Sequence, residues 1–177
     1  MPTAEPSDAF AGDPDGMDRL WTPHRLVYLN KDAPEAGCAF CNAPQRSDED
    51  GLIVYRGVSA YVIMNLYPYN SGHIMVCPFR HVATYDLATH DEVAEIGALT
   101  QTAMTVLSSV TGCDGFNIGM NQGEVAGAGI ADHLHQHIVP RWKNDANFFP
   151  IIAQTKAFPR LLGDMRTSLS EAWPRTS

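Results

Sequence analysis

Apolar side chains recur every three or four residues between Thr89 and Gly112, which predicts a long amphipathic helix. The repeating positions are Val93, Ile96, Leu99, Ala103, Val106, Leu107 and Val110. Thr89 and Glu92 have the spacing of a capping box, and Gly112 is a residue type that commonly ends helices. This helix is the strongest secondary-structure prediction that the chain offers.

Short apolar segments on both sides of this helix predict five strands. GLIVYRG (51–57) and VSAYVIMNL (58–66) form a hairpin pattern with its turn near Arg56 and Gly57, and HIMVCPF (73–79) follows a turn region. GFNIGMN (115–121) and HLHQHIVP (133–140) come after the helix and flank a glycine-rich segment. This order of strands, helix and strands predicts an α+β domain with a mostly antiparallel sheet.

The two ends of the chain differ from this domain in composition. Residues 1–16 are rich in Pro, Gly, Asp, Ser and Ala and are expected to form a disordered tail. Residues 17–145 are expected to form one domain that includes an N-terminal arm with large apolar side chains. Residues 146–177 are expected to form an extension with a helix that begins near Pro159.

Length and charge limit the classes of partner. The 177 residues, 45% of them hydrophobic, suit one compact domain, and the net charge of −8 argues against a broad basic surface. No apolar run is long enough to span a bilayer, and the first residues lack the features of a signal peptide. We therefore expect a soluble, cytoplasmic protein that binds neither nucleic acid nor membrane and holds any anionic ligand in a local site.

Three histidines alternate within five residues, at positions 133, 135 and 137, and share one face of the predicted strand. They could form an exposed polar face, a three-histidine metal site, or a nucleophile with helpers. Imidazoles about 7 Å apart along a strand cannot easily converge on one ion at bond lengths of about 2 Å. A neutral imidazole can instead attack phosphorus to give a phosphoramidate, so the nucleophile interpretation is favoured.

The segment HLHQHIV, from His133 to Val139, resembles the signature of the histidine triad (HIT) superfamily of nucleotide hydrolases and transferases. The resemblance continues through residues 65–78, 115–123 and 140–142, in the family's order, and covers roughly residues 20 to 145. Gln136 departs from it, because the family has an apolar residue at that position. The resemblance implies a HIT-like fold with one long helix and a C-terminal helix, assembled as a homodimer.

The resemblance also implies roles for four histidines. His135 would be the nucleophile that attacks the α-phosphorus of a nucleotide, and His137 would hydrogen-bond the phosphate oxygens. The backbone carbonyl of His133 would hold His135 in the required tautomer, and His73 would support the triad.

Further ligand contacts follow from the same resemblance. Asn65 would contact the ribose and Asn121 would lie beside the scissile bridging oxygen, although both residue types are also common in turns. Backbone N–H groups in the glycine-rich loop, at Gly127 and Gly129, would cradle phosphate oxygens. Related enzymes commonly have Ser, Gln or Thr just before the triad, so contact here would depend on backbone groups.

Cys38 and Cys41 have the spacing of a zinc knuckle. A redox pair and two free cysteines are the alternatives, but the redox motif lacks its usual preceding strand and following helix. Among relatives with such a pair, the other two ligands are a histidine after the third strand and the first histidine of the triad. These positions are His81 and His133 here, which implies a closed, structural Cys2His2 zinc site.

The N-terminal arm, the segment NLYPYN (65–70) and the C-terminal extension are similar to the bacterial diadenosine tetraphosphate phosphorylase branch of the family. This similarity implies that inorganic phosphate discharges a nucleotidyl-histidine to give ATP and ADP. Two alternatives stay open: a hydrolase of dinucleoside polyphosphates or nucleoside phosphoramidates, and a non-catalytic zinc-stabilised nucleotide-binding module. Arg80, Arg141 and Lys143 are either cations for the anion or solvated surface charges.

Overall fold

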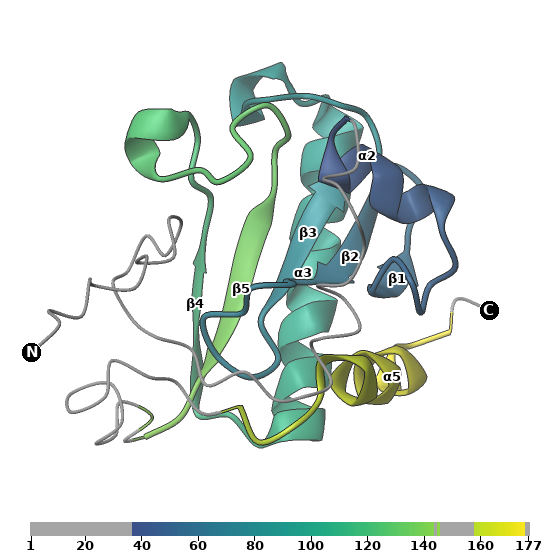
Figure 1. Cartoon of the computed structure of the whole chain (residues 1–177), viewed down its shortest axis with the longest axis vertical. Helices are drawn as coiled ribbons and strands as arrows, with labels where there is room; N and C mark the ends of the chain where they lie inside the picture. The colour runs from purple at the N-terminus through teal and green to yellow at the C-terminus, as the bar shows by residue number, and fades with distance from the viewer. Residues whose placement is uncertain (1–36, 144, 146–157, 176–177) are drawn as a thin grey trace, which may run out of the picture.

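The computed structural model describes residues 37–143, 145 and 158–175, and its centre is one five-stranded sheet (Figure 1). The strand order is β1-β2-β3-β5-β4, and every neighbouring pair is antiparallel. The strands are β1 (Ile53–Arg56), β2 (Ala60–Met64), β3 (Ile74–Pro78), β4 (Gly115–Gly119) and β5 (Gln136–Arg141). The predicted α+β class and antiparallel sheet are confirmed.

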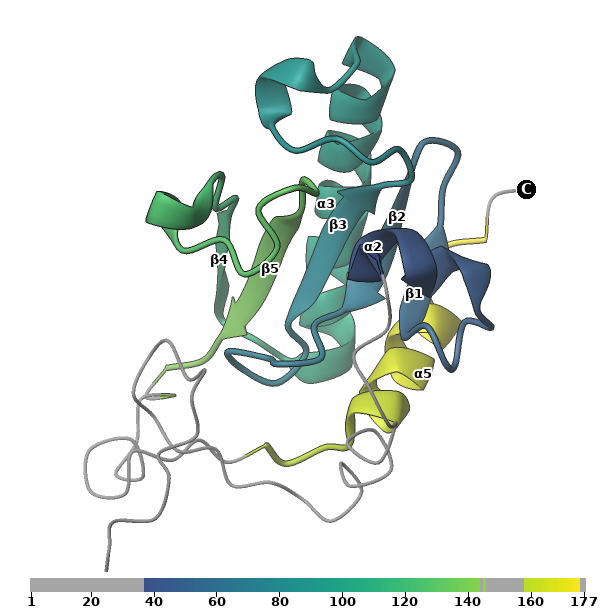
Figure 2. The same ribbon diagram turned by 45° about the horizontal axis from the view of Figure 1, so that its top comes forward.

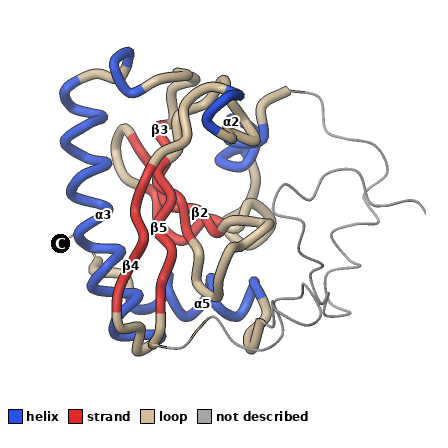
Figure 3. The backbone as a smooth tube through the Cα atoms, turned by 90° about the vertical axis from the view of Figure 1, so that its left-hand side faces the viewer, coloured by secondary structure: helices blue, strands red, loops and turns tan. Residues whose placement is uncertain are grey.

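Helices lie on both sides of this sheet. The long helix α3 (His90–Thr111) runs along one face, and the short helix α2 (Ala39–Asn42) lies on the other side (Figure 3). The C-terminal helix α5 (Leu162–Ala172) contacts β1 and α3 (Figure 2). Among the described residues, no helix combines the length and apolar character needed to cross a bilayer.

The central strands are buried because both of their faces are covered. All five residues of β2 and all five of β3 are buried, as expected of apolar, β-branched segments in the middle of a sheet. The side of α3 that faces the sheet contributes the periodic positions Ile96, Leu99, Ala103, Val106 and Leu107, which are all buried. The apolar periodicity of the sequence therefore corresponds to the core.

Both ends of α3 are formed as the sequence predicts. The Thr89 hydroxyl accepts a hydrogen bond from the Glu92 backbone N–H at 3.2 Å, and the Glu92 carboxylate accepts one from the Thr89 N–H at 2.8 Å. Arg80 pairs with Glu92 at 2.7 Å and, as the largest cause, lowers the pKa of Glu92 to about 2. Gly112 ends the helix in the left-handed conformation, with φ of 63°.

Some predicted boundaries are wrong. The last strand begins at Gln136 rather than His133, because only Gln136 and later residues pair with β3 and β4. The C-terminal helix begins at Leu162 rather than near Pro159. The described segments outside the predicted strands and helices also contain short helical turns that the sequence did not predict: α2 and the 3-10 turns η2 (Ala43–Gln45), η3 (Tyr85–Leu87) and η4 (Glu124–Ala126).

Part of the predicted organisation lies outside the described residues. This applies to the tail at residues 1–16, the N-terminal arm and the start of the extension at 146–157. The domain boundaries at residues 16/17 and 145/146 stay predictions.

The carboxylate of Glu95 on α3 fixes the turn between β1 and β2. It accepts hydrogen bonds from the backbone N–H groups of Val58 at 2.7 Å and Ala60 at 3.0 Å, and also from the N–H and hydroxyl of Ser59. A side chain at Gly57 would collide with this carboxylate and with the Ala60 carbonyl oxygen, which an added Cβ would approach to 2.7 Å. Glu95 thus connects the first hairpin to the helix.

Replacing this carboxylate should destabilise the fold, because three backbone donors would lose a charged acceptor. We expect Glu95→Ala to lower the free energy of unfolding by about 2 kcal/mol, measured by urea denaturation. The exposed Glu171→Ala is the control and should change it by less than about 0.5 kcal/mol. Equal effects of the two substitutions would contradict this role of Glu95.

Candidate active site and metal centre

The two faces of β5 have different functions in the structure. Ile138 is fully buried on the α3 side, and the Gln136 amide on the same side donates to the Thr100 hydroxyl of α3 at 2.6 Å. His135 and His137 therefore project to the opposite face, where their ring centroids are 4.9 Å apart. Gln136, the polar residue that interrupts the apolar pattern, therefore has a hydrogen-bond partner on α3.

A backbone hydrogen bond fixes the tautomer of His135. Its Nδ1 lies 2.7 Å from the carbonyl oxygen of His133, in a buried position. Because a carbonyl can only accept, Nδ1 carries the hydrogen and Nε2 of the neutral ring carries the lone pair. The arrangement leaves His135 with a nucleophilic nitrogen.

Two consecutive hydrogen bonds fix the tautomers of His73 and His137. The backbone N–H of Tyr69 donates to His73 Nδ1 at 3.0 Å, so His73 Nε2 of the neutral ring carries the hydrogen. This Nε2 lies 2.9 Å from His137 Nδ1 and donates to it. His137 then carries its own hydrogen on Nε2, where it can donate to an oxygen of a ligand.

These assignments require neutral imidazoles, and burial provides that condition. Burial, followed by the neighbouring rings of His137 and His135, lowers the pKa of His73 to about 3. Burial, followed by His135, lowers the pKa of His137 to about 4. Burial also lowers the pKa of His135. Near pH 7 the three rings are therefore uncharged, so the tautomers assigned to His135, His73 and His137 apply.

The two predicted asparagines occupy different environments. Asn65 is buried beside His73, with its amide nitrogen 3.3 Å from His73 Nδ1 and its oxygen accepting from the Tyr67 N–H at 2.9 Å. Asn121 is half-buried and lies two residues beyond Gly119, which pairs with His137 across the sheet. Contacts of Asn65 and Asn121 with a nucleotide stay predictions.

The glycine-rich loop follows β4 and contains the single turn η4. Gly123 and Gly127 have positive φ values of 81° and 80°, which favour glycine at both positions. Gly129 is different, because its φ is not positive and an added Cβ would meet no atom within 4 Å. The backbone therefore demands glycine at Gly127 but not at Gly129.

Two of the three cations considered from the sequence, Arg80 and Arg141, have partners in the fold. Arg80 pairs with Glu92, and Arg141 pairs with Asp145 at 2.6 Å and with the Asn117 side chain at 2.6 Å. Both guanidinium groups are about half exposed and paired with carboxylates, which favours surface charges over cations for the anion.

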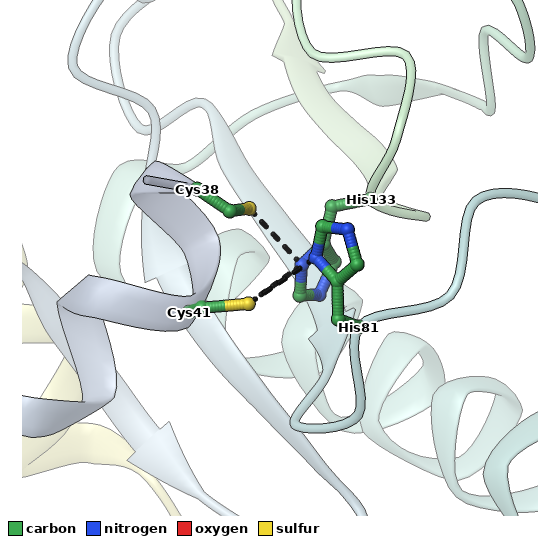
Figure 4. A group of neighbouring side chains, drawn as sticks. All are labelled: Cys38, Cys41, His81 and His133. Carbon is green, nitrogen blue, oxygen red and sulfur yellow. Dashed lines mark hydrogen bonds between the residues drawn. The ribbon is translucent and has the colours of Figure 1, made fainter. Parts of the chain in front are cut away.

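Four side chains from distant parts of the chain meet at one point: Cys38, Cys41, His81 and His133, whose ligand atoms all lie within 4.8 Å of one another (Figure 4). Cys38 precedes α2 and Cys41 lies within it, His81 follows β3, and His133 precedes β5. The four predicted metal ligands are thus brought together.

The donor atoms of this cluster suit one tetrahedral ion. His133 Nε2 donates to the carbonyl of Pro78 at 2.9 Å, which leaves the lone pair on Nδ1. This Nδ1 lies 3.3 Å from Cys38 Sγ and 3.5 Å from Cys41 Sγ. His81 Nδ1 lies 3.3 Å from Cys41 Sγ. Tetrahedral zinc with two sulfur and two nitrogen ligands requires separations of about 3.3 to 3.8 Å. These three distances lie in that range, and all four ligand atoms lie within 4.8 Å of one another, so an ion would draw the more distant ones together.

Two aromatic residues at the site were not singled out from the sequence. The Phe40 ring lies 4.8 Å from the His135 ring, and the Tyr69 ring lies 4.7 Å from His73 and 5.6 Å from His137, measured between centroids. The only sequence signal was their position, Phe40 between the two cysteines and Tyr69 four residues before His73. Contacts across the fold decide their roles.

Comparisons with known proteins agree with this geometry. The HIT domain model matches residues 46–144. A Mycobacterium tuberculosis protein named AP-4-A phosphorylase is 46% identical over 176 residues, covering 95% of this chain and 90% of the relative. The asymmetrical bis(5'-nucleosyl)-tetraphosphatase of Schizosaccharomyces pombe is 31% identical over 93 residues, covering 52% of this chain and 50% of the relative.

Solved structures show the same fold. A hypothetical histidine triad nucleotide-binding protein from Sulfolobus tokodaii superposes with a TM-score of 0.62 at 26% identity, covering 76% of this chain and 91% of that protein. A zinc-bound histidine triad family protein from Mycobacterium smegmatis superposes with a TM-score of 0.61 at 24% identity, covering 77% and 92%. With its family match, its near full-length relative and its histidine geometry, the chain belongs to the HIT domain family.

Proposed function

We propose that this protein is a nucleotidyltransferase that cleaves diadenosine tetraphosphate through a nucleotidyl-histidine and passes the nucleotidyl group to inorganic phosphate. The observation that carries the proposal is the tautomer pattern of the site. It leaves a lone pair on His135 Nε2 and a hydrogen on His137 Nε2, side by side on one face of the sheet. One ring is thereby prepared to attack and the other to donate to the phosphate.

In the first step, the His135 Nε2 lone pair forms a bond to the α-phosphorus, and the bond from that phosphorus to the bridging oxygen breaks. The bonding electrons leave with ATP. The charge that develops on His135 is stabilised through Nδ1, which stays hydrogen-bonded to the His133 carbonyl. His137 Nε2 donates to an oxygen of the phosphoryl group.

In the second step, an oxygen of inorganic phosphate attacks the same phosphorus. The phosphorus–nitrogen bond breaks, its electrons return to His135 Nε2, and the product is ADP. The 46% identical relative named AP-4-A phosphorylase supports phosphate as the acceptor. Asn65, Asn121 and the backbone at Gly127 and Gly129 would hold the ribose, the bridging oxygen and the phosphates.

The metal proposed for the four-residue cluster is a structural zinc ion. Two thiolates and two imidazoles make a closed ligand set with no position for substrate. When bound, the ion would connect α2 to the segment before β5, and it would take no part in the chemistry.

The homodimer is proposed from the exposed edge of the sheet. Among the described residues, β5 is the only strand that pairs with β4, and Ile118 on β4 is 44% exposed. An edge strand with an exposed apolar side chain is suited to a second copy of the chain. The cytoplasmic location and the lack of nucleic-acid and membrane partners stay predictions.

Removing the nucleophile should abolish turnover. We expect His135→Ala to lower kcat for diadenosine tetraphosphate by about 10⁴-fold, and imidazole to restore part of the activity of His135→Gly. His90→Ala, at an exposed histidine outside the site, is the control and should leave kcat unchanged. A non-catalytic binding module would show no turnover in the wild type either.

The acceptor can be identified from the products. With labelled inorganic phosphate, we expect equal amounts of ATP and ADP, with the label in ADP. Without phosphate, ATP release should stop after about one equivalent per active site, leaving a covalent adduct detectable by mass spectrometry. Continued formation of AMP and ATP without phosphate would identify a hydrolase.

Zinc should accompany the purified protein. We expect about one equivalent of zinc per chain, and Cys41→Ser should lose most of it and lower the melting temperature by about 5 °C or more. Cys113→Ser is the matched control, because Cys113 lies outside the cluster, and it should retain the metal. Less than about a tenth of an equivalent in the wild type would refute the site.

A further inference from the structure

Phe40 connects the metal cluster with the proposed nucleophile. It lies between Cys38 and Cys41 and is the buried residue of α2, with 6% of its surface exposed. Its ring centroid lies 4.8 Å from that of His135, tilted by 39°, and 5.5 Å from that of His133, nearly edge-on at 64°. The same side chain therefore touches one metal-ligand residue and the proposed catalytic residue.

The orientation of His135 depends on more than its hydrogen bond. The ring is held at Cγ by its own side chain and at Nδ1 by the hydrogen bond to the His133 carbonyl, and the angular tolerance of that bond still allows a limited rotation of the ring plane. The His137 ring, 4.9 Å away, and the Phe40 ring, 4.8 Å away, restrict this rotation. Attack on phosphorus needs the Nε2 lone pair aligned with the breaking bond, so the ring plane affects the rate.

Phe40 in turn depends on contacts made by α2. A helix of four residues is too short to be stable by itself. The Tyr61 hydroxyl of β2 donates to the Phe40 carbonyl at 2.6 Å, and the cysteines on either side lie 3.3 to 3.5 Å from His133 Nδ1. A metal ion held by both cysteines would fix the backbone on each side of Phe40.

We propose that Phe40 is a positioning residue for His135, and that metal occupancy of the Cys38, Cys41, His81 and His133 cluster holds Phe40 in place. This inference rests on the proposed nucleotidyl transfer for its kinetic consequence. Its structural part, the contact between the Phe40 and His135 rings, can be measured without any substrate. The structural metal thereby acts on catalysis through an apolar side chain.

The kinetic test uses two aromatic-to-leucine variants of the zinc-loaded protein. Phe40→Leu removes the ring beside His135, whereas Tyr55→Leu removes a ring stacked on Trp173 at 5.2 Å. Tyr55 lies on β1, which β2 and β3 separate from β5. We expect Phe40→Leu to slow adduct formation by about 10²-fold with little change in KM, and Tyr55→Leu to leave the rate unchanged.

The structural test uses NMR on the wild-type protein, with and without a zinc chelator. We expect nuclear Overhauser effects between the Phe40 and His135 rings in the zinc form, and their loss on chelation. Nuclear Overhauser effects between the Tyr55 and Trp173 rings, stacked 5.2 Å apart and away from the cluster, report that the fold persists. Zinc analysis of Phe40→Leu, with the expected result of unchanged metal content, separates loss of the ring from loss of the ion.

The outcomes distinguish this inference from the proposed function. Adduct formation at the wild-type rate in Phe40→Leu would overturn the positioning role and leave nucleotidyl transfer intact. Ring contacts that survive chelation would overturn the link to the metal. A wild-type protein that forms no adduct, yet loses the Phe40–His135 contact on chelation, would refute the proposed function while the structural part of the inference stands.

Discussion

The site depends on His133, because one residue contributes to two arrangements at once. Its imidazole joins the cluster with Cys38 and Cys41, and its carbonyl accepts the hydrogen bond that fixes the tautomer of His135. A second hydrogen bond, from His133 Nε2 to the carbonyl of Pro78, ties the same ring to the end of β3. The backbone before β5 is thereby held by its neighbours, although it makes no sheet pairing itself.

The histidines owe their chemistry to burial rather than to nearby cations. Burial lowers the pKa of His73, His135 and His137, so that the rings stay neutral near pH 7 and each nitrogen keeps a defined role. Neutral rings avoid mutual repulsion at centroid distances near 5 Å. Arg80 and Arg141 are engaged by carboxylates. Recognition of an anion at this face would therefore depend on hydrogen-bond donors more than on net charge.

The two sides of the sheet have different roles. α3 covers one face of the sheet and supplies the apolar core, while the histidines, Phe40 and the metal cluster occupy the other side, where α2 lies. β5 participates in both, because Ile138 and Gln136 face the helix and His137 faces the site. The alternation of side chains along one strand is sufficient to keep these functions apart.

Local patterns in the sequence determined the elements whose stabilising contacts are close in the chain. The capping box at Thr89 and the helix stop at Gly112 needed only neighbouring residues, and both are present in the fold. The pattern of the first hairpin is also local, although its turn is held in the fold by Glu95 of α3. The spacing of Cys38 and Cys41 indicated a metal site, and the resemblance to a family added His81 and His133 as its other ligands and the expected roles of the histidines. The tertiary structure alone decided the start of β5, the partner of Gln136 and the packing of Phe40 on His135. These features join residues 36 to 95 positions apart, and no local propensity encodes which distant groups will meet.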